Sequence, residues 1–160
     1  MDLEKILPTN GPSNNEVKKY IEKYSDEIIV IKCGGSVLLD KNLFKQFIED
    51  ISVIKKLGLS TIVVHGGGKN IKKKLDNLNI ESKFINGLRV TDEKTIKIVE
   101  EALLELNDEI INKLNNLQAS AQSVAPQKNN VIKIKPERQE LGYVGSPKEI
   151  NSNTLLKIIK

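Results

Sequence analysis

The segment IIVIKCGGS, residues 28–36, is a β-branched apolar run that ends in a lysine and a glycine-rich turn. The segment TIVVHGGG, residues 61–68, repeats this pattern. Continuous β-branched runs are typical of strands buried on both faces of a parallel sheet. An amphipathic helix is predicted between them, over residues 41–57, and a lysine-rich helix after them, over residues 69–78. This alternation of strand, turn and helix predicts an α/β fold with a mainly parallel sheet.

The N-terminal flank of the first strand has a different composition. Residues 1–15 contain prolines, a glycine and several asparagines, which predict a flexible lead-in. Apolar residues at helical spacing predict a short amphipathic helix over residues 16–24. We therefore expect a lead-in over 1–15, a helix and link over 16–26, and one domain over 27–160.

The C-terminal flank begins with an extended segment over residues 80–90. Thr91 is expected to be the N-cap of a long helix that ends near residue 117, because its hydroxyl can accept a hydrogen bond from a backbone N–H of the first turn. Two strands joined as a hairpin are predicted over residues 121–125 and 131–134.

The composition excludes several classes of protein. The chain has 160 residues, 39% hydrophobic and 29% charged, as in a soluble globular domain. No apolar stretch approaches the roughly 20 residues that cross a bilayer. A single cysteine, Cys33, and a single histidine, His65, exclude an internal disulfide and a Cys/His zinc site. The net charge of +4 comes almost entirely from lysine and aromatic residues are 4%, which argues against a nucleic-acid partner. We expect a cytoplasmic protein without membrane contact.

Both glycine turns, residues 34–35 and 66–68, follow strand ends, where ligands bind in open parallel sheets. Glycine lets backbone N–H groups approach anionic oxygens closely. Neither turn has the spacing of a Walker phosphate loop or a dinucleotide fingerprint, and one glycine turn alone is also an ordinary tight turn. Two such turns at equivalent strand ends predict an anion site.

Two cationic residues are candidates for binding an anion. Lys32 closes the first strand, so its ammonium is expected at the rim, where it would stabilise a transferring phosphoryl group. The alternative is a lysine that extends into solvent. Arg89 offers a planar fork that binds a carboxylate through two hydrogen bonds. The alternative for Arg89 is a surface ion pair with Asp92 or Glu93.

Other polar residues have simpler interpretations. His65 lacks a nearby nucleophile or acid in the sequence and is expected to position its turn rather than act as a base. Cys33 is interpreted as a small residue at a strand end. Lys72, Lys73 and Lys74 predict a solvated helix face rather than a phosphate-binding patch.

Three of these segments resemble motifs of the amino-acid kinase family. Residues 31–36, IKCGGS, resemble its first motif, and residues 63–68, VVHGGG, resemble its second. Residues 86–92, NGLRVTD, are similar to the substrate-binding segment of the members that phosphorylate N-acetyl-L-glutamate. The resemblance covers residues 16–160 and implies a three-layer αβα sandwich with a mainly parallel sheet.

The resemblance also implies a reaction, the ATP-dependent phosphorylation of the side-chain carboxylate of N-acetyl-L-glutamate to N-acetyl-L-glutamyl 5-phosphate. This is the second step of arginine biosynthesis, and Mg²⁺ would accompany the ATP. Arg89 would bind the α-carboxylate of the substrate. The matching positions would take these roles: Lys32 as transition-state stabiliser, Gly34 and Gly35 at the ATP phosphates, and Gly67, Gly68 and Arg89 at the substrate.

Two departures from the family pattern are visible. Residues 123–130 lack the expected turn with glycine and aspartate, and Lys128 stands about where the aspartate is expected. The nucleotide-binding half, with a second phosphate-stabilising lysine and a catalytic loop, is expected beyond Lys160.

Further expectations concern assembly and alternative functions. The helix over residues 16–24 resembles the N-terminal helix of arginine-inhibited hexameric members, so a homo-oligomer (dimer or hexamer) and feedback inhibition by arginine are expected of a full-length protein. One alternative function is a kinase for a related acylated acidic amino acid of the aminoadipate type. The other is a non-catalytic substrate-binding or assembly module.

Overall fold

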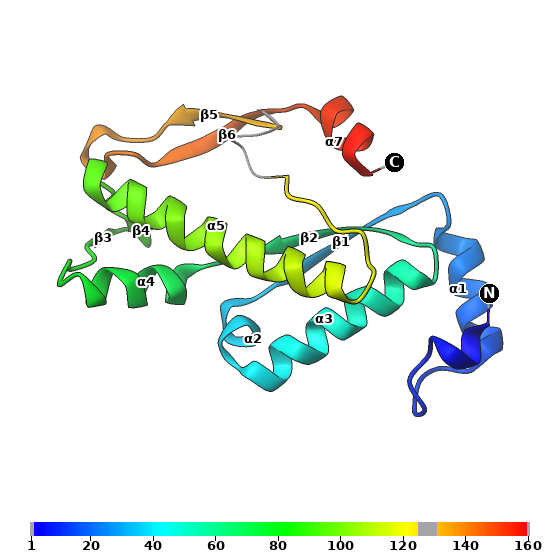
Figure 1. Cartoon of the computed structure of the whole chain (residues 1–160). Coiled ribbons are helices and arrows are strands. Elements are labelled where there is room, and N and C mark those ends of the chain that lie inside the picture. Colours follow the sequence, from blue (N-terminus) through cyan, green and yellow to red (C-terminus); the bar gives the residue numbers. More distant parts are fainter. Residues whose placement is uncertain (1, 125–130, 160) are drawn as a thin grey trace. The chain divides into compact units, whose positions relative to one another are not determined.

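The computed structural model describes residues 2–124 and 131–159 (Figure 1). Contacts divide the chain into two compact units, unit 1 with residues 1–65 and 110–122, and unit 2 with residues 66–109 and 123–160. The elements in chain order are η1 (Leu3–Lys5), α1 (Asn14–Tyr24), β1 (Ile28–Cys33), α2 (Gly35–Leu39), α3 (Lys41–Lys56), β2 (Ser60–His65), α4 (Gly68–Asn77), β3 (Phe84–Ile85), β4 (Leu88–Arg89), α5 (Glu93–Asn116), β5 (Ile132–Pro136), η2 (Gln139–Leu141), β6 (Gly145–Ile150) and α7 (Ser152–Ile159).

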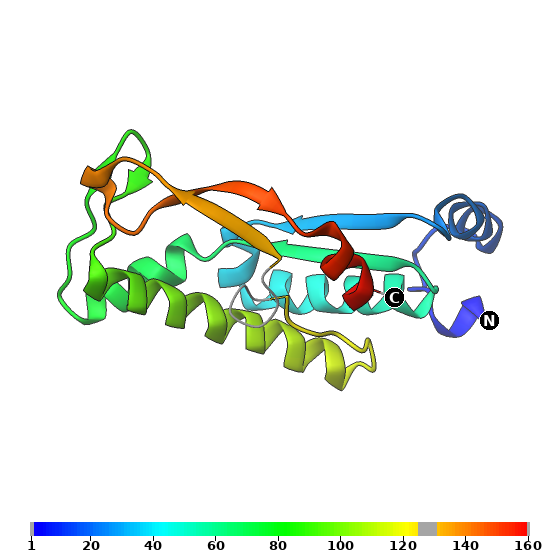
Figure 2. The same cartoon turned by 90° about the horizontal axis from the view of Figure 1, so that it is seen from above.

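The strands β1 and β2 of unit 1 form a parallel pair, whose register runs from Ile28 beside Ser60 to Cys33 beside His65. Their ribbons run side by side in both views (Figures 1 and 2). The chain passes from β1 to β2 through α2 and α3, since parallel strands require a crossover connection. The predicted α/β class with a parallel sheet is confirmed.

One face of this strand pair differs from the prediction of burial on both faces. Val30 on β1 is 63% exposed and Val64 on β2 is 48% exposed. The opposite face is covered, and Cys33 there is 2% exposed. Among the described residues no third strand pairs with either β1 or β2, so each of them has a free edge in that part of the chain.

The N-terminal helix α1 begins two residues earlier than predicted. Ser13 is its N-cap, and the Glu16 backbone N–H donates to Ser13 Oγ while the Ser13 N–H donates to the Glu16 carboxylate at 3.0 Å. This reciprocal pair is the capping box that the spacing of Ser13 and Glu16 encodes. Within the lead-in, Leu3 is buried and packs with Val17 and Leu57 in a small apolar cluster.

In unit 2 the helix α4 packs against the first half of α5. Their shared core contains Ile71, Leu75, Ile98 and Ala102. Leu75 is fully buried, as expected for a residue on the apolar face of a helix that is otherwise rich in lysine.

The long helix α5 begins one residue later than predicted. Its N-cap is Asp92, because the Ile96 N–H donates to the Asp92 backbone oxygen and the Thr95 N–H donates to Asp92 Oδ1 at 2.7 Å. Thr91 was expected in this role, but its backbone pairs with Gly142 instead.

The predicted hairpin of residues 121–125 and 131–134 is wrong. Residues 121–124 form no strand, and residues 125–130 lie outside the described part of the chain, together with most of the altered loop. The strand β5 pairs instead with β6 in an antiparallel ladder, in which Lys133 and Glu149 form a 2.9 Å ion pair. The glycine and proline in β6 weaken its strand signal in the sequence, so the partner was missed.

Candidate functional site

The predicted site residues fall into two groups, one in each unit. Lys32, Gly34 and Gly35 belong to unit 1, at the C-terminal end of β1. The register of β1 and β2 brings this strand end beside the end of β2, where His65 lies directly before the second glycine turn. Gly67, Gly68 and Arg89 belong to unit 2.

Lys32 lies on the exposed side of β1, beside Val64 of β2. Its side chain alternates with that of Cys33, which points into the protein. Within residues 2–124 and 131–159 no carboxylate forms an ion pair with Lys32, so its charge is not neutralised by a structural contact.

The first glycine turn has a backbone that does not itself require glycine. Gly34 has φ −78° and ψ 157°, an extended conformation open to any residue, and Gly35 is the first residue of α2. A Cβ atom added at either position would meet no atom within 4 Å. Neither the backbone conformation nor a contact with a described residue therefore requires glycine at these two positions.

The three glycines of the second turn, residues 66–68, do not all have the same packing. A Cβ added at Gly66 or Gly68 would meet nothing within 4 Å. A Cβ added at Gly67 would lie 2.5 Å from Leu103 Cδ2 on α5, so this glycine makes room for the packing of α5 near the start of α4. Gly68, the first residue of α4, has no such neighbour.

Arg89 is placed by a short hairpin that the sequence analysis described only as an extended segment. The strands β3 and β4 are antiparallel, and Phe84 pairs with Arg89 across them. Asn86 and Gly87 form the two-residue connection, with φ values of 51° and 81°. Positive φ at both positions is the type I′ turn that favours the Asn-Gly pair, so this dipeptide was the available signal.

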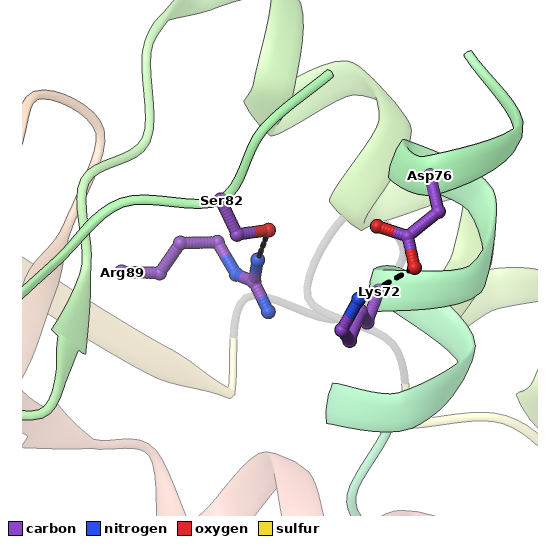
Figure 3. Close-up of polar contacts among 4 residues, drawn as sticks. All are labelled: Lys72, Asp76, Ser82 and Arg89. Atoms are coloured by element: carbon purple, nitrogen blue, oxygen red, sulfur yellow. Dashed lines mark hydrogen bonds and ion pairs between the residues drawn. The ribbon is translucent and has the colours of Figure 1, made fainter. Parts of the chain in front are cut away.

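Two side chains contact the guanidinium of Arg89. Its Nη1 donates to Ser82 Oγ, as Figure 3 shows. Its Cζ lies 4.7 Å from the centroid of the Phe84 ring, within the range of a cation–π interaction. The side chain is therefore held in one place although the residue is only partly buried.

The alternative interpretation of Arg89, a surface ion pair, is not realised. Glu93 pairs with Lys97 at 3.0 Å, and Asp92 caps α5. Across the described residues the Arg89 guanidinium pairs with no carboxylate. A cation that is held by neutral groups and lacks an acidic partner is suited to binding the carboxylate of a small molecule.

Backbone hydrogen bonds from the C-terminal segment hold the end of this hairpin in place. These contacts were not predicted from the sequence. The Thr91 N–H donates to the Leu141 oxygen at 2.9 Å, and the Tyr143 N–H donates to the Thr91 oxygen at 2.7 Å. Thr91 Oγ1 donates to the Arg89 oxygen at 3.0 Å. Gly142 has φ 67°, and a Cβ there would collide with the Thr91 backbone oxygen, so only glycine allows this approach.

The three consecutive lysines of α4 have different contacts. Lys72 pairs with Asp76 one turn later at 2.6 Å (Figure 3), and Lys73 is exposed. Lys74 bridges to α5 through Glu101 at 3.2 Å and Glu105 at 2.7 Å. The hydrogen bond with Glu105 raises the pKa of Lys74. The run is thus a helix surface with an added interhelical contact.

Cys33 has the environment of a structural residue. It is 2% exposed, and burial raises the pKa of its thiol. Since the thiolate is the reactive form, this cysteine is not set up as a nucleophile.

The model of the amino acid kinase family matches residues 27–160. The chain belongs to the amino acid kinase family. An acetylglutamate kinase from Pelagibacter ubique is 56% identical over 99% of this chain and 55% of its own length. One from Thermoanaerobacter pseudethanolicus is 42% identical over 91% of this chain and 50% of its own. This amino acid kinase chain therefore spans about half the length of the curated relatives it matches.

Two solved structures are similar in fold to this chain. The crystal structure of smu.665 from Streptococcus mutans matches with a TM-score of 0.71 and 30% identity, over 82% of this chain and 54% of the other. An N-acetylglutamate synthase from Neisseria gonorrhoeae, complexed with coenzyme A and N-acetyl-glutamate, matches with a TM-score of 0.73 and 18% identity, over 91% and 34%. The second match shows likeness of fold alone.

Two further features are absent from the described ranges. No helix there is both long and apolar enough to span a membrane. No group of three or more histidine, cysteine, aspartate or glutamate side chains in residues 2–124 and 131–159 is placed to hold a metal ion.

Proposed function

We propose that the chain forms the acetylglutamate-binding part of an enzyme that transfers the γ-phosphoryl group of ATP to the side-chain carboxylate of N-acetyl-L-glutamate. The observation that carries the proposal is Arg89, which is held by Ser82 and Phe84 and has no acidic partner among the described residues. The 56% identity to an acetylglutamate kinase supports the choice of substrate.

In this proposal each site residue acts through charge and position. Arg89 binds the α-carboxylate and so orients the side-chain carboxylate for in-line attack. Gly67 and Gly68 present backbone to the same substrate. Lys32 stabilises the charge that develops on the transferring group, and Gly34 and Gly35 let the ATP phosphates approach the backbone.

The described residues contain no group of three or more His, Cys, Asp or Glu side chains that could hold a metal ion, so magnesium is not proposed as a resident ion. A Mg²⁺ ion would arrive with the phosphates of ATP, and no step of the proposal depends on protein ligands for it. We further propose a cytoplasmic enzyme of arginine biosynthesis that forms homo-oligomers and responds to arginine, as the resemblance implies.

Binding of N-acetyl-L-glutamate, measured by titration calorimetry, tests the proposal. We expect Arg89→Ala to raise the Kd at least about tenfold, because a charge-assisted hydrogen-bond pair is lost. Arg138→Ala is the matched control, since Arg138, the other arginine, lies in an exposed 2.9 Å ion pair with Glu140. Equal affinity of Arg89→Ala and the unchanged chain would remove Arg89 from the site.

The two alternative functions give different results in the same assay. Tighter binding of N-acetyl-L-2-aminoadipate than of N-acetyl-L-glutamate would favour the aminoadipate type. Binding of N-acetyl-L-glutamate without formation of acyl phosphate, when ATP and Mg²⁺ are supplied, would favour a binding module. Acyl phosphate trapped with hydroxylamine would establish phosphoryl transfer.

A further inference from the structure

Arg89 would bind a carboxylate more tightly if its guanidinium is already held where the substrate arrives. An arginine side chain has about 2 kcal/mol of rotamer entropy to lose on binding, so a free arginine is a weak anchor. In this structure the guanidinium already has a defined place, given by one hydrogen bond and one aromatic ring.

The two contacts act on different parts of the guanidinium. Ser82 Oγ accepts a hydrogen bond from Nη1 and thereby holds one end of the planar group. The Phe84 ring, 4.7 Å from Cζ, lies against its face. Neither neighbour carries a charge, so together they position the cation without neutralising it, and its remaining N–H groups stay available to a carboxylate.

The hairpin accounts for the contact between Phe84 and Arg89. Phe84 is the cross-strand partner of Arg89, and side chains of directly opposed residues lie on the same face of a strand pair. Phe84 is 56% exposed, so it is not a core residue. Ser82 precedes β3 by two residues, and its hydroxyl meets the same guanidinium.

We propose that Ser82 and Phe84 are positioning residues that pre-orient Arg89 for the α-carboxylate of the substrate and so contribute to the choice of a carboxylate over a neutral group. This rests on the proposed function of Arg89. Pre-orientation strengthens binding because the entropy of fixing the side chain is lost on folding rather than on binding.

The test compares two disruptive variants with two conservative ones. Ser82→Ala removes the acceptor and Phe84→Leu removes the ring but keeps an apolar side chain, whereas Ser82→Thr and Phe84→Tyr keep the interacting group. Tyr20→Leu on α1 is the control for loss of an exposed aromatic residue, since Tyr20 is 57% exposed and belongs to unit 1.

Two ligands, N-acetyl-L-glutamate and its α-amide, are titrated against each variant. We expect Ser82→Ala and Phe84→Leu to weaken binding of the carboxylate about tenfold and to reduce its preference over the amide. Ser82→Thr and Phe84→Tyr should restore most of that preference. A merely structural role would lower the affinity for both ligands equally, and this result would overturn the inference.

A spectroscopic measurement separates this inference from the proposed function. The Arg89 Nε–H signal should carry a ring-current shift from Phe84 that is lost in Phe84→Leu and kept in Tyr20→Leu. If the unchanged chain binds N-acetyl-L-glutamate but both disruptive variants bind it with the same affinity, only the positioning role is overturned. The same conclusion follows if the unchanged chain binds the substrate but Arg89 shows no ring-current shift. A shifted signal with no binding of N-acetyl-L-glutamate overturns the proposed function, and the positioning role with it.

Discussion

Gly67 and Gly68 are adjacent, but they are glycine for different reasons. A side chain at Gly67 would collide with Leu103, whereas a side chain at Gly68 would point into open space. The sequence could show only that both positions are glycine. The distinction depends on the packing of α5, a helix that begins 25 residues further along the chain, and no local pattern contains that information.

Alanine at these two positions should therefore separate packing from function. We expect Gly67→Ala to lower the free energy of unfolding by about 1–3 kcal/mol, because Leu103 must shift. Gly68→Ala should leave that free energy unchanged or raise it by up to about 1 kcal/mol, since alanine favours helix, and should weaken N-acetyl-L-glutamate binding. Urea unfolding and titration calorimetry measure the two effects. A Gly68→Ala chain with normal affinity would contradict the role of Gly68 at the substrate.

The hairpin of β3 and β4 shows what sequence can predict of an element. The Asn-Gly pair at residues 86–87 encodes its turn, and the NGLRVTD segment pointed to Arg89. The contact of Arg89 with Phe84 follows from the hairpin register, which an extended segment does not specify. Within the NGLRVTD segment, Asn86 and Gly87 therefore have a structural role, because they form the turn of the hairpin.

The strands that contact distant partners were the hardest elements to predict. The parallel pair of β1 and β2 was predicted because both strands are β-branched and regular. The partner of β5 was not, because β6 contains Gly145 and Pro147, and the Lys133–Glu149 contact across the two strands is visible only in the structure. Long-range pairing depends on such cross-strand contacts more than on the propensity of either strand.

The N-cap of α5, Asp92, should stabilise the folded protein by an amount that depends on pH. Hydrogen bonds from the Thr95 hydroxyl and the Thr95 backbone N–H hold the pKa of Asp92 below its ordinary value. A carboxyl group whose pKa is lowered by folding stabilises the protein above its unfolded-state pKa, about 3.9, and this contribution is lost as the pH falls through the lower folded-state value.

We expect Asp92→Asn to reduce the stability difference between pH 5 and pH 2.5, because asparagine keeps the cap but cannot titrate. Urea unfolding at a series of pH values measures this. Glu93→Gln is the control, since Glu93 forms only an exposed pair with Lys97. Identical pH profiles for Asp92→Asn and the unchanged chain would show that Asp92 is not the titrating group.

On the scale of the whole molecule, the exposed face of β1 and β2 should determine whether the chains associate with one another in solution. Val30 and Val64 expose apolar surface on a strand pair that no further described strand extends. Exposed apolar faces and free strand edges promote association between chains.

The 160-residue chain should therefore self-associate with increasing concentration, and the double variant Val30→Thr/Val64→Thr should do so less. Threonine is β-branched and keeps the strand propensity while reducing apolar surface. Sedimentation velocity over a range of concentrations measures the effect. Leu39→Thr serves as the control, since Leu39 is 49% exposed at the end of α2. A chain that remains monomeric throughout would contradict this expectation.

The division of the chain into two units also has a consequence for the order of events on the ribosome. Each unit is assembled from two stretches that alternate along the sequence, so neither is complete when its first stretch has been synthesised. The bridge from Thr91 to Gly142 joins residues about 50 positions apart. At about 5–20 residues per second, several seconds of translation separate the emergence of Arg89 from that of the segment that holds its hairpin. The nascent chain thus completes the surroundings of Arg89 late, after both strands of unit 1 have been synthesised.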